Sequence, residues 1–87
     1  MTDASQATID EIRKAIVQAG RLKIEPEAIG LDDKLYGPES LGLHSIDTFD
    51  LVTDVETKFG VTVPDDEIPK LNSVSAILAF VQNHRNG

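Results

Sequence analysis

The strongest pattern in the 87-residue sequence lies at residues 41–59, which read Leu-Gly-Leu-His-Ser-Ile-Asp-Thr-Phe-Asp-Leu-Val-Thr-Asp-Val-Glu-Thr-Lys-Phe. Ser45 follows a glycine-containing loop, and we predict a helix from Ser45 to about Phe59. At about 100° per residue, this helix has two faces. The face predicted to turn inward consists of Thr48, Leu51, Val52, Val55 and Phe59. The outer face combines threonines, carboxylates and one apolar residue: Ile46, Asp47, Asp50, Thr53, Asp54 and Thr57.

Ser45 has two chemical uses at the start of a helix. The simpler use is as an N-cap, whose hydroxyl accepts a hydrogen bond from a free backbone N–H group. The other use is as an attachment point, because the N–H groups and the dipole at a helix N-terminus would stabilise a phosphate ester on Ser45. Ile46, on the outer face among acids, suits a docking surface, although single exposed isoleucines are common.

Two more helices are predicted from the spacing of apolar residues. The first runs from about residue 6 to residue 19, and Thr8-Ile-Asp-Glu reads as its capping box. The last begins after Asn72 or Ser73 and extends into a C-terminus that we expect to be frayed over residues 84–87. Its inward stripe is predicted to contain Val74, Ile77, Leu78 and Val81.

The segments between these helices differ in composition. Glycines and prolines interrupt residues 20–44, so we expect a long loop there, packed onto the helices by its own apolar side chains. Those side chains are Leu22, Ile24, Ile29, Leu31, Leu35, Tyr36, Leu41 and Leu43. A short acidic turn at residues 65–68, ended by Pro69, precedes the last helix.

Together these elements predict an all-α fold. It has three long helices, one short helix and a long loop between helices one and two. Residues 1–87 form a single domain, in which residues 1–4 are a loose N-terminus.

Composition excludes several classes of function. Fifteen acidic against eight basic residues give a net charge of −7, which disfavours nucleic-acid binding. The absence of cysteine excludes disulfides, thiolate metal sites and cysteine nucleophiles. No apolar run approaches the ~20 residues of a membrane span, and no signal-peptide pattern is present, so we expect a cytoplasmic protein without membrane insertion.

Enzyme chemistry is not indicated by the sequence. The chain has two histidines, and no Ser-His-Asp or metal-ligand spacing is evident around them. We therefore predict that the protein is not an enzyme, with no catalytic residues and no metal site.

The runs at residues 41–52 and 59–65 resemble those of acyl carrier proteins. The family's order of elements is also present, with Thr8-Ile-Asp-Glu leading the first helix and Asn72-Ser-Val leading the last. The resemblance covers nearly the whole chain, and the joint pattern is more specific than any of its parts.

This resemblance implies an acyl-carrier-like helical bundle that carries acyl groups. Ser45 matches the serine that receives 4′-phosphopantetheine from coenzyme A through a magnesium-dependent phosphopantetheinyl transferase, and acyl groups then bind the arm's thiol as thioesters. The resemblance also implies docking onto basic patches of acyl-loading and acyl-transfer enzymes. The matching docking positions are Ile46, Asp47, Asp50, Glu56 and Asp65, to which the helical wheel adds Asp54.

His44 is the departure from the family pattern, and we include it among the docking residues. Fatty-acid carriers usually read Asp-Ser-Leu where this chain reads His-Ser-Ile. A His-Ser pair is more typical of peptidyl carrier domains of nonribosomal synthetases, whereas the downstream acids favour the acyl type. We therefore expect a free-standing, monomeric acyl carrier protein for a specialised lipid or secondary metabolite. Two alternatives stay open, a peptidyl carrier protein and an unmodified acyl-carrier-like interaction domain.

Overall fold

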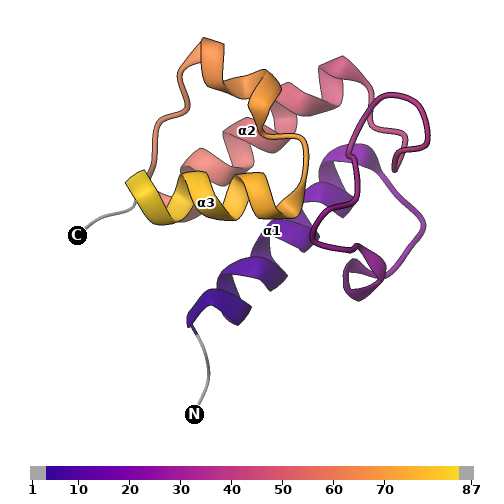
Figure 1. Cartoon of the computed structure of the whole chain (residues 1–87), viewed down its shortest axis with the longest axis horizontal. Coiled ribbons are helices and arrows are strands. Elements are labelled where there is room, and N and C mark those ends of the chain that lie inside the picture. The colour runs from indigo at the N-terminus through magenta and orange to yellow at the C-terminus, as the bar shows by residue number, and fades with distance from the viewer. Residues whose placement is uncertain (1–3, 85–87) are drawn as a thin grey trace.

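The computed structural model describes residues 4–84, and all regular structure within them is helical. Three α-helices are joined by connections that each contain a short 3-10 helix (Figure 1). In chain order the elements are α1 (Ala4–Gly20), η1 (Pro26–Ala28), α2 (Ser45–Phe59), η2 (Asp65–Lys70) and α3 (Val74–His84). The predicted all-α fold is confirmed, with η2 as the short helix and the long loop between α1 and α2.

The core lies among the three long helices, and α1 contacts both α2 and α3. Each fully buried aliphatic side chain contributes roughly 1.5–3 kcal/mol relative to an exposed one. The large fully buried residues on the helices are Ile12, Ile16, Leu51, Val55, Val74, Ile77 and Val81. On α2 the predicted inward face is confirmed: Thr48, Leu51, Val52 and Val55 are buried, and Phe59 is half-buried.

The connection between α1 and α2, residues 21–44, is packed, as predicted. Ile29, Leu35 and Leu43 are buried beneath it, whereas Ile24 and Leu31 are exposed, contrary to our expectation. The exposed Leu31 still anchors the connection through its backbone, because its carbonyl accepts a hydrogen bond from the Ser75 N–H at 2.9 Å.

The connection between α2 and α3, residues 60–73, begins at Gly60. Its φ of 66° is left-handed, which favours glycine and ends the helix as predicted. The short helix η2 runs through Pro69 to Lys70, so the predicted stop at Pro69 is wrong. Proline keeps a φ compatible with helix, and the Leu71 N–H closes the next turn on the Ile68 carbonyl at 3.1 Å.

The helix ends also correct the sequence-based expectations. Helix α1 begins at Ala4, so Thr8 lies buried inside the helix and cannot form the predicted capping box. Helix α3 includes His84, whose ring stacks on Phe80 with the ring centroids 4.0 Å apart. The rest of the expected loose and frayed ends, residues 1–3 and 85–87, lies outside the described residues. The predicted cap by Ser73 is confirmed, since its Oγ accepts the Ala76 N–H at 3.2 Å.

Candidate functional site

The start of α2 is built around the backbone of residues 44–47. His44 is the N-cap, with extended backbone (φ −91°, ψ 162°), so the prediction that Ser45 is the cap is wrong. Ser45 is the first helical residue. The Asp47 carboxylate folds back and accepts the His44 backbone N–H at 2.9 Å, which satisfies a donor at the helix start. Asp47 therefore helps to fix the helix start.

The backbone of Ser45 lies at an open point of the surface. Its two chain neighbours are exposed: His44 faces solvent, and 72% of Ile46 is accessible. Leu43, one residue earlier, is buried and anchors the chain where it emerges from the core. The side chain of Ser45 lies outside the described part of the structure. A helix start held from both sides and open to solvent is suited to receiving an anionic group, because its first N–H groups favour negative charge.

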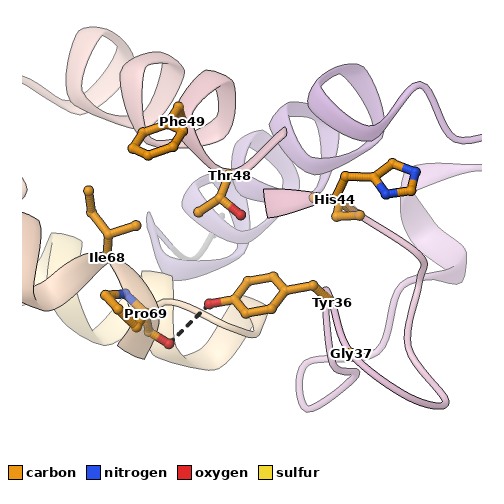
Figure 2. A pocket seen from close by; sticks show the side chains of 8 residues that line it. Tyr36, Gly37, His44, Thr48, Phe49, Ile68 and Pro69 are labelled. Carbon is orange, nitrogen blue, oxygen red and sulfur yellow. Dashed lines mark hydrogen bonds between the residues drawn. The ribbon is translucent and has the colours of Figure 1, made fainter. Parts of the chain in front are cut away.

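An apolar groove of about 490 Å³ lies between α2 and η2, beside the start of α2 (Figure 2). The residues that line it come from the long connection, the first turns of α2 and η2: Tyr36, Gly37, Leu43, His44, Thr48, Phe49, Ile68 and Pro69. Its volume is within the roughly 300–1,000 Å³ of sites that hold a small ligand. Since His44 directly precedes Ser45, the groove adjoins the predicted attachment residue.

Tyr36 forms part of the wall of this groove. Its hydroxyl donates a hydrogen bond to the Pro69 carbonyl at 3.0 Å, which links the long connection to η2 (Figure 2). Burial raises the pKa of Tyr36 above its usual value, because the charged phenolate is poorly solvated there. The hydroxyl therefore remains a donor throughout the neutral pH range.

Phe49 is the site residue that the sequence reasoning missed. It lines the groove, yet 62% of its side chain is exposed. It lies three residues after Ile46, so both side chains belong to one exposed side of α2. The signal was present in the sequence as this three-residue spacing between two large apolar residues.

The predicted docking acids occupy different environments. Asp50 is exposed and Asp54 is half-buried, and both line a shallow pocket with Arg21. The half-buried Glu56 accepts the Val63 backbone N–H through its carboxylate at 2.7 Å and so holds the chain after α2. Asp65 is exposed at the start of η2. The acids are therefore not equivalent, since Asp47 and Glu56 already serve local hydrogen bonds.

Two further observations concern the described residues 4–84. Within them, no three histidine, aspartate or glutamate residues come together in a group that could hold a metal ion. None of the helices in this range has the length and apolar character needed to cross a membrane.

Comparison with known proteins places most of the chain in one sequence family. A family model described as "Phosphopantetheine attachment site" matches residues 10–81. The chain is 35% identical over 74 residues to an acyl carrier protein of Campylobacter hominis, covering 85% of this chain and 89% of that protein. It is 37% identical over 79 residues to an acyl carrier protein of Thermosynechococcus vestitus, covering 91% of this chain and 94% of that protein. The matched region contains the start of α2 and every residue that lines the groove.

Proposed function

Because the chain belongs to the acyl carrier protein family, we propose that Ser45 is the residue to which its 4′-phosphopantetheine is covalently attached. The arm supplies a terminal thiol that holds acyl groups as thioesters. Members of this family are carriers and not catalysts, so the prediction that the protein is not an enzyme is confirmed by family membership. They work with a phosphopantetheinyl transferase and with acyl-processing enzymes.

The place of Ser45 in the fold is the observation that supports this proposal most strongly. Ser45 begins α2 between two exposed residues, His44 and Ile46. The phosphodiester formed on attachment would lie at the helix N-terminus, where negative charge is stabilised by about 0.3–1 kcal/mol. No such combination surrounds Ser40, whose hydroxyl donates to the Gly37 carbonyl at 2.6 Å within a turn.

The groove beside Ser45 is the proposed resting place of the apolar part of the acyl group. Its lining is largely apolar, and it adjoins the start of α2 through His44. Transfer of an alkyl chain from water into such a groove is favourable by about 0.8 kcal/mol per buried CH₂ group. An acyl group held there would be shielded from water between enzymatic steps.

The proposed docking surface consists of Ile46, Phe49, Asp50 and Asp65, which are all exposed around the start of α2 and η2. Basic patches on partner enzymes complement such acids, and charge complementarity mainly increases the association rate. His44 and Asp54 flank this surface. Asp47 and Glu56 contribute charge to it but are held by the backbone N–H groups of His44 and Val63. We expect the protein to dock as a monomer, and a cytoplasmic location also stays a prediction.

The proposed pathway is a specialised lipid or secondary-metabolite pathway. Support comes from His44, which removes a negative charge beside Ser45 relative to the usual fatty-acid carrier. His44-Ser45 also favours the second candidate, a peptidyl carrier protein. Replacing His44 with Asp distinguishes selection of partners by His44 from a substitution without functional effect. If His44 selects partners, the variant is modified faster by a transferase of the fatty-acid type, and unchanged rates across transferases contradict selection.

Intact-mass measurement tests the attachment site. The wild-type protein, Ser45→Ala and Ser40→Ala are each incubated with coenzyme A, Mg²⁺ and a broad-specificity transferase. We expect the mass of one phosphopantetheinyl group to be added to the wild type and to the Ser40→Ala control, and nothing to Ser45→Ala. Modification of Ser45→Ala, or resistance of the wild type to several transferases, contradicts the proposal and favours an unmodified interaction domain.

A further inference from the structure

Tyr36 joins two segments that are far apart in the chain, across the groove wall. Its hydroxyl donates to the Pro69 carbonyl, 33 residues later, at 3.0 Å. Figure 2 shows the phenol ring reaching from the long connection toward η2, with Thr48 and Phe49 on the α2 side. The bond therefore fixes the distance between the long connection and η2, both of which line the groove.

Tyr36 itself projects from a firmly held segment. Leu35, its chain neighbour, is completely buried, and the Leu35 N–H donates to the Asn72 carbonyl at 3.0 Å. The Leu35 carbonyl in turn accepts the Leu43 N–H at 2.9 Å. The backbone next to Tyr36 is thus tied on both sides, so the position of the phenol is set by the long connection.

By contrast, η2 has few contacts that hold it in position, and its core contact is made by the half-buried Ile68. None of its residues is buried. Its backbone bonds are local, from Glu67 N–H to the Pro64 carbonyl and from Leu71 N–H to the Ile68 carbonyl. Its ion pair, Lys70 to Glu67 at 3.2 Å, is solvent-exposed, and such pairs contribute little to stability. The buried Val63 and Leu71 hold the chain on either side of η2, and Tyr36 bonds η2 at Pro69, near its C-terminal end.

We propose that Tyr36 is a latch that holds η2 against the long connection and thereby limits the size of the acyl group that the groove accepts. The size limit rests on the proposed function, because it requires the acyl group to lie in the groove. A single hydrogen bond is weak enough to open when a larger group enters.

Hydrogen exchange of the unmodified protein tests the latch without any acyl group. Tyr36→Phe keeps the ring and removes the donor. We expect the Glu67 and Leu71 amides to exchange about fivefold faster in this variant, the factor that corresponds to one net hydrogen bond. Exchange in α1 should not change. If the Glu67 and Leu71 amides of Tyr36→Phe exchange at the same rates as in the wild type, the latch is overturned.

Ser75→Ala is the matched control for loss of a hydroxyl. Its Oγ bonds the Asp32 carboxylate at 3.3 Å, away from the groove. We expect this variant to leave exchange in η2 unchanged. Equal acceleration of η2 by Ser75→Ala and Tyr36→Phe would mean that general loosening, and not the latch, causes the effect.

A series of saturated acyl chains of increasing length tests the size limit. Each chain is attached to the arm, and the Tm is measured for wild type and Tyr36→Phe. We expect the rise in Tm to stop at a certain chain length in the wild type and at a longer one in Tyr36→Phe. The same limit in both proteins overturns the size-limiting role. If no chain raises the Tm of the wild type, the proposed placement of the acyl group is wrong, and faster exchange in Tyr36→Phe then identifies a latch without that role.

Discussion

The two connections of this bundle differ in where their buried residues lie relative to the groove. The longer one, residues 21–44, has three fully or nearly fully buried anchors, Ile29, Leu35 and Leu43, and backbone hydrogen bonds to Asn72 and to Ser75 of α3. The shorter one, residues 60–73, also has three buried residues, Val61, Val63 and Leu71, but they flank η2, which itself has none. Local stability follows buried contacts and protected hydrogen bonds more than loop length. The groove beside Ser45 thus has one firmly held wall and one weakly held wall.

This difference suits a carrier that must both hold and release an acyl group. The firm wall keeps the start of α2 and the neighbourhood of Ser45 in place for partner enzymes. The weak wall, η2, can move outward at small cost because it has no fully buried residue and is held to the rest of the groove by the half-buried Ile68 and the bond from Tyr36 to Pro69. Four predictions examine this contrast, from the largest expected effect to the smallest.

The first compares an apolar anchor from each connection. Leu35→Ala removes a side chain that is 0% exposed, and we expect it to lower the free energy of unfolding by about 2–5 kcal/mol. Ile68, in η2, is only half-buried, so we expect Ile68→Ala to lower the free energy of unfolding by less than half as much. Urea denaturation of both variants measures the difference. A larger loss for Ile68→Ala would reverse the assignment of firm and weak walls.

The second concerns the acid that ties the shorter connection to α2. Glu56→Ala leaves the Val63 N–H without its carboxylate partner, and we expect a loss of about 1–3 kcal/mol in the free energy of unfolding. Asp50→Ala removes an exposed acid with no such bond among the described residues and should change stability by less than about 0.5 kcal/mol. Equal effects of the two changes would show that Glu56 is a surface charge like Asp50.

The third prediction concerns which of the two connections the partner enzymes approach. Asp65→Lys reverses a charge at the start of η2, and Glu25→Lys makes the same change in net charge on the longer connection. We expect Asp65→Lys to slow association with a partner enzyme about fivefold, roughly 1 kcal/mol, and to weaken the salt dependence of the rate. Stopped-flow association at several ionic strengths measures both. Equal slowing by Glu25→Lys would indicate a net-charge effect with no docking surface.

The fourth and smallest effect is the pH dependence of the latch. The folded state raises the pKa of Tyr36 above 10.0, so its contribution to stability is complete below the pKa of the unfolded chain. The contribution is then lost as the pH rises through the folded value. Tyr36 is the one tyrosine and the chain has no tryptophan, so tyrosinate absorbance reports this residue alone. Identical titration midpoints in native and urea-unfolded protein would contradict burial of the phenol.

The helices and their inner faces were predictable because they depend on local periodicity. The helix from Ser45 to Phe59 follows directly from the spacing of apolar residues. Its end at Gly60 follows from the need for a left-handed residue there. The proposal that Ser45 is the attachment residue also rests on a pattern that is contiguous in sequence, and it stays a prediction. The cap was not, because His44 serves through its backbone while Asp47 supplies the carboxylate. Residue type alone favours serine at that position.

The groove and the roles of its residues depend on contacts between distant segments, which no local pattern contains. The partner of Tyr36 lies 33 residues away, and a carbonyl acceptor leaves no trace in the sequence. Glu56 and Asp50 have the same charge, but only Glu56 accepts a backbone N–H from the loop that follows α2. Packing of the chain after Gly60 decides this difference.

The most direct test asks whether the acyl chain binds against η2, the weakly held wall of the groove beside Ser45. It compares hydrogen exchange of the holo protein with and without an attached acyl chain. The chain length is chosen below the limit found for the wild type. We predict that acylation slows amide exchange in η2 and the first turns of α2, while residues 21–35 of the longer connection stay unchanged. Slowing confined to the longer connection, or no change anywhere, would contradict the groove as the site of the acyl group.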